Sequence, residues 1–388
     1  MTPRRIVLSV TNDLVTDQRV HRSCTALMEA GYIVTLIGRR LPHSADIDRP
    51  YRTVRMRLLF TKKAPFYAEY NLRLLMRLLF TRTDAFYAND TDTLPANWVA
   101  SRLRKKPLLF DAHEMFPEVP ELVGRPRVKH FWKRIEDFLF PRLQRHRCGA
   151  VTVCQSIADI YHKRYGLKMA VVRNVPLPQP TDARQDNLTL PFENDGRQIL
   201  LYQGAVNIGR GIEWIMDAMP YLPECIFVVA GTGDIYNELC ARAQGSDNIL
   251  MLGRVEPPAL HRLTPLAALG MSLLENRGLN YYYSLPNRIA DYIQAGVPVL
   301  ATDFPEIHRV IQQYAVGTLV DPPPFDAEKN TSVPPDPEQL AHTIRHTLNY
   351  WNSIPKNERQ ARFSRAAKDL SFQNDKKTLL DTLEAIFH

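Results

Sequence analysis

Cysteine is scarce in this sequence, with five among 388 residues. The five are scattered, none forms a CxxC pair, and no Cys/His cluster has the spacing of metal ligands. An odd and dispersed set of this kind argues against a disulfide framework and favours a reducing compartment. We therefore expect a cytoplasmic protein and no metal site.

Long hydrophobic runs are also missing. No stretch of about 18 apolar residues occurs, which is the least that a membrane-spanning helix needs. The apolar run that follows Arg4 and Arg5 stops at Asn12 and Asp13, and it is too short for the core of a signal peptide. Both absences agree with a cytoplasmic location.

The dinucleotide fingerprint of dehydrogenases is incomplete. The stretch VVAGTGDIY places Gly231 and Gly233 after a predicted strand, but the third glycine of the fingerprint is missing. The next strand, NILMLG, ends in Gly253 instead of the acidic residue that would bind a ribose. A dehydrogenase is therefore disfavoured, and no DxD motif is arranged for Mg²⁺.

What the chain does contain is an uneven distribution of charge. Residues 1–180 carry 31 Lys and Arg against 16 Asp and Glu, whereas residues 181–388 carry 18 against 25. A basic half favours an anionic partner, either nucleic acid or an anionic membrane surface. Solubility alone explains the charge about equally well. We expect no nucleic-acid partner, because no zinc-finger, aromatic RNA-binding or helix-turn-helix signature is present.

Short apolar strands alternate with helical patterns in both halves of the chain. In the first half we predict strands at Arg4 to Thr11, 32–38, 84–88, 107–111 and 150–154, the last followed by a helix capped by Ser156. In the second half we predict strands at 198–204, 226–231, 248–253, 269–274 and 297–302. The pattern predicts the α/β class, with two Rossmann-like, doubly wound parallel sheets that face each other across a cleft.

The composition also predicts domain boundaries. We expect an N-terminal domain at residues 1–180, a Pro-rich linker at 181–197 and a second domain at 198–370. Residues 371–388 are predicted to form a C-terminal helix that packs back on the first domain.

Two segments, 56–70 and 76–90, are nearly identical in sequence but differ in period. Val54, Met56 and Leu58 alternate with arginines, which predicts a strand. In residues 67–83, Arg73, Arg77 and Arg82 recur at spacings of four and five among apolar residues, which predicts an amphipathic helix. Docking on anionic lipid through residues 55–82 is one interpretation, and core packing with solvent-reaching arginines is the other. The basic residues concerned are Arg55, Arg57, Lys62, Lys63, Arg73, Arg77 and Arg82.

Phosphate-binding features gather in the second half. In LYQGAVNIGRGIEW, Gly204 follows a strand and Arg210 precedes a helix, so backbone N–H groups and a cation meet at a helix N-terminus. In SLPNRIADYIQAGVPVL, Pro286 is predicted at the first position of a helix, with Arg288 beside it. One turn further, Asp291 could accept hydrogen bonds from a ribose diol. These parts fit a nucleoside diphosphate.

These motifs resemble those of family-4 glycosyltransferases of GT-B fold. The resemblance rests on Ser284 to Leu300 and on YQGAVNIGRGIEWI, VVAGTGDIYNEL, LGRVEPPALHRL and, in the first half, DAHEMFPE. It implies a retaining transferase that uses a nucleotide-diphosphate sugar without a metal ion or other cofactor. It further implies a glycan or polyprenyl-linked acceptor at the inner membrane surface, in bacterial surface polysaccharide or lipopolysaccharide synthesis.

The resemblance also implies roles for individual residues. The catalytic candidates are His113, Arg210 and Arg288. The donor-binding candidates are Gly204, Arg210, Gly231, Gly253, Arg254, Ser284, Leu285, Pro286, Asn287, Arg288 and Asp291. The acceptor-binding candidates are Asp13, Asp17, Arg19 and His113.

Three features depart from the family pattern. Ala205 stands where an arginine often follows the first glycine, and Tyr283 stands where the first of two acidic residues is common, with Glu275 upstream as a candidate replacement. The segment TNDLVTD takes the place of a glycine-rich loop.

Alternatives remain for several residues. Neighbouring carboxylates could hold His113 for structure alone, and Asp13 and Asp17 could simply shape their loop. Asp90 and Asp92 are predicted to cap the helix that follows them. The segment NYYYS could line a sugar pocket or belong to the core. At the level of function, the alternatives are a nucleotide-sugar epimerase of the same architecture and a non-catalytic nucleic-acid-binding protein.

Overall fold

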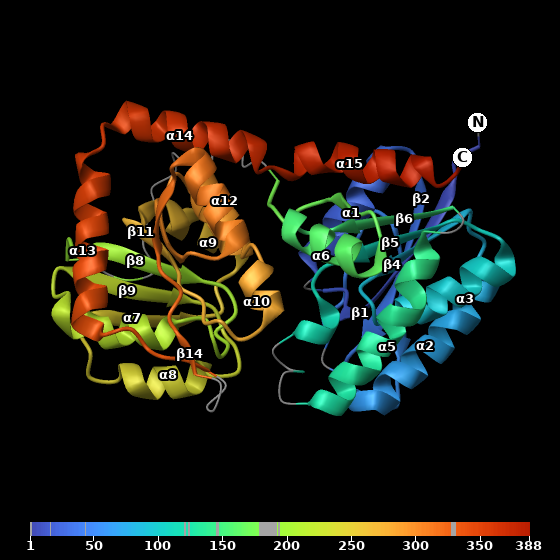
Figure 1. Cartoon of the computed structure of the whole chain (residues 1–388), viewed down its shortest axis with the longest axis horizontal. Coiled ribbons are helices and arrows are strands. Elements are labelled where there is room, and N and C mark those ends of the chain that lie inside the picture. The colour runs from blue at the N-terminus through green and yellow to red at the C-terminus, as the bar shows by residue number, and fades with distance from the viewer. Residues whose placement is uncertain are drawn as a thin grey trace. The chain divides into compact units, whose positions relative to one another are not determined.

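The chain folds into two compact units, each built on a parallel sheet (Figure 1). Unit 1 comprises Met1–Asn174 and Gln373–His388, and unit 2 comprises Val175–Phe372. The predicted linker at 181–197 lies largely outside the described residues. The computed structural model describes residues 2–15, 17–42, 44–119, 122, 125–144, 147–177, 192, 195–326 and 331–388.

The sheet of unit 1 has the strand order β3-β2-β1-β4-β5-β6-β7, and every pair of neighbours is parallel. β4 and β5 are buried along their whole length, as expected for strands that are covered on both faces. The strands are β1 (Arg5–Asp13), β2 (Ile33–Arg40), β3 (Arg52–Arg57), β4 (Ala85–Asn89), β5 (Leu108–Ala112), β6 (Cys148–Thr152) and β7 (Ala170–Val171).

Helices cover this sheet on both sides. Figure 1 shows α2, α3 and α5 together on one side and α1 and α15 on the other. Lys376 of α15 forms an ion pair with Glu29 of α1 at 2.6 Å. The helices are α1 (Gln18–Glu29), α2 (Lys63–Phe80), α3 (Leu94–Arg104), α5 (Pro126–Leu143), α6 (Gln155–Tyr165) and α15 (Phe372–Ala385), with a short 3-10 helix at Phe116–Glu118.

The two similar segments form different structures, as their periods predict. The first falls on the strand β3 and the start of α2, and the second on the end of α2 and β4. α2 buries Phe66, Tyr70, Leu74 and Leu78, which recur every fourth residue and so lie along one stripe of the helix.

The sheet of unit 2 has the order β10-β9-β8-β11-β12-β13 and is also parallel throughout. A separate antiparallel pair joins β14 (Phe325–Asp326) to β15 (Thr331–Ser332). The strands of the sheet are β8 (Gln198–Gln203), β9 (Cys225–Ala230), β10 (Ile249–Gly253), β11 (Leu269–Ser272), β12 (Val299–Thr302) and β13 (Gly317–Val320).

The core of unit 2 lies between its sheet and the helices that pack on it. Leu340 and Ile344 of α13 join Ile212 and Ile215 of α7 in one buried cluster, and Figure 1 shows the two helices side by side. The helices are α7 (Ile212–Ala218), α8 (Tyr236–Ala243), α9 (Pro257–Leu263), α10 (Leu279–Tyr283), α11 (Asn287–Ala295), α12 (Pro305–Tyr314), α13 (Pro337–Ser353) and α14 (Lys356–Asp369), with 3-10 turns at Met219–Tyr221 and Thr264–Leu266.

Two predicted helix starts are wrong by one or two residues. Pro286 is the N-cap of α11, with ψ of 133°, and Asn287 is the first helical residue. The N-cap of α6 is Cys154, so Ser156 lies inside the first turn. In both cases the N-cap residue has an extended backbone. The residue that predicts the helix start, Pro286 or Ser156, lies within one turn of the true boundary.

Candidate active site

The first six strands of each unit, counted from its own first strand, have the order 3-2-1-4-5-6, which reverses direction between the first and fourth strands, and unit 1 adds a seventh strand at the edge. Ligands of open α/β sheets bind outside the carboxyl ends of the strands at this switch point. In unit 2 the switch point lies between β8 and β11, and in unit 1 between β1 and β4. The predicted site residues can be placed relative to these two points.

In unit 2 the turns after β8 and β9 are in close contact. The Gly204 amide donates to Ala230, and the Gly231 amide donates to Gly253 at 2.8 Å. A Cβ at Gly231 would lie 1.8 Å from the Gly204 oxygen, and Gly231 has φ of +156°. Only glycine fits at position 231. The turn after β9 therefore packs directly against the turn after β8, the strand that borders the switch point.

Arg288 of α11 approaches the Gly204 turn. Its guanidinium carbon lies 4.2 Å from the centre of the Tyr202 ring. A Cβ at Gly204 would be 3.7 Å from the Arg288 Nη2. The Arg288 side chain is 7% exposed, and its Nη1 has no hydrogen-bond partner among the described residues. A buried cation of this kind favours an anionic ligand at the turn.

Arg210 lies on the same loop, immediately before α7. Its guanidinium carbon is 4.5 Å from the centre of the Tyr281 ring. Gly211 follows with φ of +64°, and a Cβ there would be 2.7 Å from the Leu273 oxygen. The Glu275 amide donates to Gly209 at 3.0 Å. The loop that carries Arg210 is thus held against the segment that follows β11.

Asp291 is attached to the end of β8 through Gln203. The Gln203 Nε2 donates to the Asp291 Oδ2 at 3.1 Å, and the Thr264 hydroxyl donates to the Gln203 Oε1 at 2.8 Å. The Tyr292 hydroxyl donates to Leu201 at 2.8 Å. These bonds fix α11 against β8, so Asp291, Arg288 and the Gly204 turn lie in one place.

The other predicted donor residues lie at strand ends or before α11. Ser284, Leu285 and Pro286 lead into that helix, and Asn287 is exposed at its first position. Gly253 ends β10 with φ of +68°. Arg254 is exposed and its Nε lies 3.1 Å from the Glu256 Oε1.

Glu275, the candidate for the missing acidic residue, is 6% exposed. Its Oε2 accepts from the Arg277 Nε at 2.7 Å and from the Ser332 amide at 3.4 Å. Nearby, burial and the charge of Glu275 raise the pKa of Glu213. The side chain of Glu275 therefore joins the loop after β11 to β15.

In unit 1, His113 lies among acidic groups at the ends of β4 and β5. Its Nδ1 is 3.1 Å from the Asp90 Oδ2, and its Nε2 is 3.4 Å from the Asp111 Oδ2 and 3.2 Å from the Asn89 Oδ1. Burial acts to lower the pKa of His113, but the charges of Asp90 and Asp111 outweigh it and raise the pKa to about 10. His113 is therefore a charged imidazolium at neutral pH.

Arg19 pairs with Asp111, one of the two carboxylates beside His113. It is 5% exposed, its Nη2 donates to the Asp111 Oδ1 at 2.6 Å, and its Nη1 donates to Val172 at 2.8 Å. Burial alone would raise the pKa of Asp111, but the charges of Arg19 and His113 hold it well below its ordinary value. Arg19, predicted to contact the acceptor, thus supports Asp111 from the interior.

The capping roles predicted for Asp90 and Asp92 are wrong. The N-cap of α3 is Thr93, which makes no side-chain capping bond. Asp90 has φ of +60°, a left-handed conformation that is uncommon outside glycine, and accepts from the His113 amide at 2.8 Å. Asp92 accepts from the Thr11 hydroxyl at 2.6 Å, and burial with the charge of Asp90 raises its pKa to about 7.

Asp13 and Asp17 are both engaged by other groups of unit 1. The Asp13 Oδ1 accepts from the Arg55 Nη2 at 2.8 Å, and Ser44 also donates to this carboxylate. Asp17 caps α1 by accepting from the Val20 amide at 3.0 Å. Arg55 is only 9% exposed, which removes it from any basic outer surface.

Several residues that contact the site candidates lie inside the quoted motifs but were not named as site residues. Tyr202, Gln203 and Asp111 each end a strand or lie one residue before its end. Their position at strand ends is the signal that could have found them.

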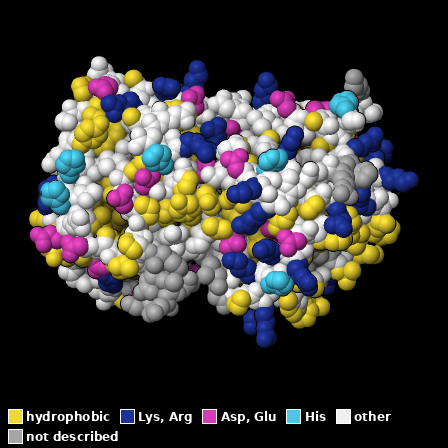
Figure 2. Space-filling view, viewed as in Figure 1, with side chains coloured by type: hydrophobic (Ala, Val, Ile, Leu, Met, Phe, Trp, Pro, Cys, Tyr) yellow, Lys and Arg dark blue, Asp and Glu magenta, His cyan; other side chains and the backbone are white. Residues whose placement is uncertain are grey.

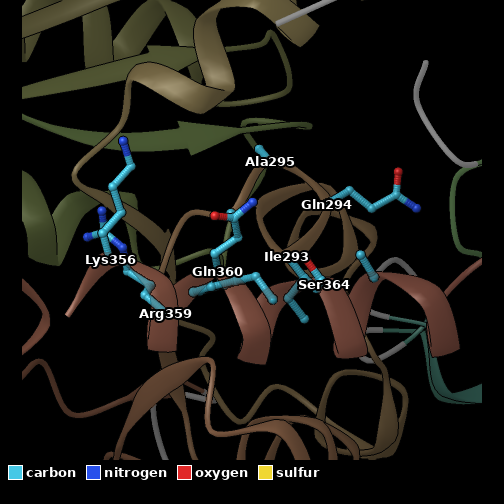
Figure 3. A pocket seen from close by; sticks show the side chains of 10 residues that line it. Ile293, Gln294, Ala295, Lys356, Arg359, Gln360 and Ser364 are labelled. Atoms are coloured by element: carbon cyan, nitrogen blue, oxygen red, sulfur yellow. The ribbon is translucent and has the colours of Figure 1, made fainter. Parts of the chain in front are cut away.

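A separate cavity in unit 2 lies away from these residues. It has a volume of about 370 Å³ and lies between the last turn of α11 and α14. Figure 3 shows Lys356, Arg359 and Gln360 of α14 near Ala295. Asn287 and Arg288 are at the opposite end of α11, so this cavity is distinct from the donor candidates.

Metal-binding clusters and membrane-spanning helices are both absent from the described residues. There, no group of three or more His, Cys, Asp or Glu side chains is arranged to hold a metal ion. None of the helices in those ranges combines the length and apolar content needed to cross a bilayer.

Comparison with known families gives two matches that together cover most of the chain. Residues 17–177 match the Glycosyltransferase Family 4 description, and residues 197–349 match Glycosyl transferases group 1. Comparison with curated proteins gives no match.

Solved structures of similar fold extend over both units. A glycosyltransferase from Rickettsia africae is 13% identical with a TM-score of 0.70, covering 100% of this chain and 99% of its own. Anabaena Alr3699/HepE, solved in complex with UDP-glucose, is 12% identical with a TM-score of 0.69, covering 98% and 100%. WaaG, a glycosyltransferase involved in lipopolysaccharide biosynthesis, is 14% identical with a TM-score of 0.65, covering 98% and 99%.

These likenesses show the GT-B fold predicted from the sequence. The two family matches show that the chain is a glycosyltransferase (EC 2.4) of family 4, with a group 1 glycosyltransferase domain in its second half.

Proposed function

We propose that the chain is a retaining glycosyltransferase whose unit 2 binds a nucleotide-diphosphate sugar. The observation that supports this most strongly is the pair of arginines at the switch point, each held against a tyrosine ring. Asp291 lies one turn from Arg288 on α11, where its carboxylate accepts from Gln203 and would also accept from a ribose diol. UDP-glucose in the Anabaena structure supports a nucleoside diphosphate as the leaving group.

Electrostatic stabilisation of the leaving diphosphate is the proposed source of catalysis. As the sugar–phosphate bond breaks, negative charge develops on the diphosphate. Arg210, Arg288 and the amides near Gly204 and Asn287 would stabilise that charge without a metal ion. Because both guanidinium groups are positioned before ligand binds, little reorganisation is required in the transition state.

His113 is proposed to bind the transferred sugar as a cation. Its high pKa makes it a poor general base at neutral pH. Its charge would attract the oxygen of a sugar hydroxyl, and the partly exposed carboxylate of Asp90 beside it would accept from a second hydroxyl, whereas Asp111 is fully buried and holds His113 in place. Arg19 would act through Asp111, and Asp13 and Asp17 through the shape of their loop.

We further propose that the acceptor is a glycan or polyprenyl-linked sugar in bacterial surface polysaccharide synthesis, used on the inner face of the cytoplasmic membrane. The likeness to WaaG supports a lipopolysaccharide-type product. The basic first half of the chain supports a membrane-borne acceptor.

The outer face of α2 supports membrane docking. Leu72, Met76 and Phe80 are 65%, 51% and 82% exposed and recur every fourth residue, so they lie in one row. Exposed Arg77 lies beside this row, and Lys62 precedes the helix. Figure 2 shows hydrophobic and basic side chains intermingled over this part of unit 1. Apolar side chains flanked by cations match an anionic membrane surface.

Sugar transfer can be tested with purified protein and a panel of nucleotide sugars. We expect one donor to release its nucleoside diphosphate faster when a lipid-linked glycan is added, with the anomeric configuration of the sugar retained in the product. Conversion of the donor into an epimer without an acceptor would instead support an epimerase.

Docking can be tested by sedimentation with anionic vesicles at low salt. Each cation near an anionic surface is worth about 1 kcal/mol. We expect Lys62→Glu with Arg77→Glu to reduce binding at least tenfold, because each change also adds repulsion. The matched control, Lys356→Glu with Arg365→Glu on α14, changes the total charge equally and should bind more strongly than the α2 variant. Equal losses in the two variants would exclude α2 as the docking surface.

A further inference from the structure

A small pocket in unit 1 is lined by three arginines. It lies at the carboxyl ends of β2 and β3, has a volume of about 320 Å³, and is separate from the site around His113. Its charged residues are Arg39, Arg40 and Arg57, and no acidic residue is among the described residues that line it. The remaining lining residues are Leu41, Pro42, Leu58, Phe60 and Thr61.

Arg39 is fixed in place without neutralisation of its charge. Its guanidinium carbon lies 4.8 Å from the centre of the Phe66 ring, and its Nη1 donates to Thr61 at 3.4 Å. The Arg39 Nε is buried and has no hydrogen-bond partner among the described residues. Neither Arg39 nor Arg57 forms an ion pair within the described part of the chain. Both guanidinium groups are therefore available to pair with an anionic ligand.

Acidic groups around the pocket are already engaged, including Asp13, which is aligned with Arg39 in the β1–β2 pairing and accepts from Arg55. Asp46 pairs with Arg40 at 3.4 Å, but its side chain is 95% exposed and the pair is weak. Glu69 accepts from the amides of Leu59 and Phe60 and pairs with Arg73 at 2.8 Å. These bonds hold the loop that forms one wall of the pocket. Among the described residues, they leave Arg39 and Arg57 without an acidic partner.

The pocket combines this charge with an apolar wall. Guanidinium groups bind phosphate oxygens through paired hydrogen bonds, and three of them in one pocket match a phosphate better than a single carboxylate. Leu41, Leu58 and Phe60 would contact carbon atoms attached to the phosphate. The loop continues directly into α2, whose exposed row is the proposed docking surface.

From this geometry we infer that the pocket at the ends of β2 and β3 binds a phosphate ester that carries an apolar chain. A lipid headgroup or a carrier phosphate supplies this chemistry from a membrane, and a small soluble ester supplies it from solution. The assignment of the bound lipid as acceptor rests on the proposed function, but phosphate binding by the pocket does not.

Arg57 offers a sharp test because the chain contains a matched control. Arg57 and Arg52 are both exposed and lie at opposite ends of β3, so Arg57→Ala and Arg52→Ala remove the same charge from the same strand. Glycerol 3-phosphate is titrated by calorimetry in a background of Arg210→Ala with Arg288→Ala, which removes the donor-site cations. We expect Arg57→Ala to weaken binding about tenfold or more and Arg52→Ala less than about twofold.

A second arm uses phosphatidylcholine vesicles with and without phosphatidic acid. Loss of soluble-ester binding in Arg57→Ala supports a pocket that recognises the free phosphate group. Loss of vesicle binding in Arg57→Ala, with no soluble-ester binding in the parent protein, supports a pocket that requires the lipid. Equal effects of Arg57→Ala and Arg52→Ala in both arms would overturn the inference. Binding of the ester through Arg57 in a protein that fails to transfer sugar would contradict the proposed function and would support the phosphate pocket.

Discussion

Replacement of His113 by glutamine gives a prediction with a worked magnitude and a pH signature. The imidazolium lies 3.1 Å from Asp90 and 3.4 Å from Asp111, and those charges raise its pKa from an ordinary 6.5 to about 10. Each tenfold change in proton affinity is worth about 1.4 kcal/mol. Loss of a buried ion pair costs about 3 to 5 kcal/mol, and the shift of the His113 pKa converts to a similar free energy. We expect His113→Gln to lower the free energy of unfolding of unit 1 by about 3 to 5 kcal/mol at pH 6.5.

The pH dependence follows from the direction of the shift. A group whose folded-state pKa is raised stabilises the fold fully below its unfolded pKa, and that stabilisation is lost as the pH rises through the folded pKa. The difference between the parent protein and His113→Gln should therefore be greatest at and below pH 6.5 and should shrink toward pH 10.

Urea unfolding at several pH values measures this difference, with hydrogen exchange of β4 and β5 reporting on unit 1. The exposed His130 of α5 provides a control, since His130→Gln should leave stability within about 0.5 kcal/mol. A difference that stays constant between pH 6.5 and 9.5, or a variant as stable as the parent, would refute the charged state of His113.

Two further predictions concern unit 2. Gly231→Ala should destabilise this unit by about 3 kcal/mol or more, because its Cβ would lie 1.8 Å from the Gly204 oxygen; Gly245→Ala, with φ of +83° and open space around it, should cost only about 1 kcal/mol in thermal unfolding. Asp291→Asn should weaken donor binding by about 1.5 to 3 kcal/mol in a folded protein, because a charge-assisted hydrogen bond is lost. An unchanged dissociation constant for the donor would exclude Asp291 from ribose binding.

Much of the fold follows from local sequence signals. Buried strands such as β4 and β5 read as short apolar runs, and the two periods around Met56 and Met76 distinguish β3 from α2. The glycine turns at Gly204 and Gly231 were recognisable because they follow such runs. These features depend on residues that are neighbours in the chain, so the sequence alone predicts them.

The detailed environment of the site could not be read in the same way. His113 meets Asp90 because parallel pairing aligns the ends of β4 and β5, and Arg288 meets Tyr202 because α11 packs beside β8. Arg55 reads as a surface cation within a basic segment, yet the fold pairs it with Asp13. Such contacts depend on strand register and on helix packing between distant residues, which local patterns do not encode.

Binding of nucleoside diphosphates to unit 2 tests the central claim most directly. Calorimetric titration of the full chain with UDP, GDP, ADP, CDP and dTDP should show one ligand that binds without a divalent metal. Arg210→Ala and Arg288→Ala should each weaken that ligand by at least about tenfold, while Arg254→Ala, which alters an exposed arginine paired with Glu256, should have a smaller effect. Failure of all five nucleotides to bind, or equal affinity in the parent protein and in both arginine variants, would contradict the assignment of the switch point in unit 2 as the donor site.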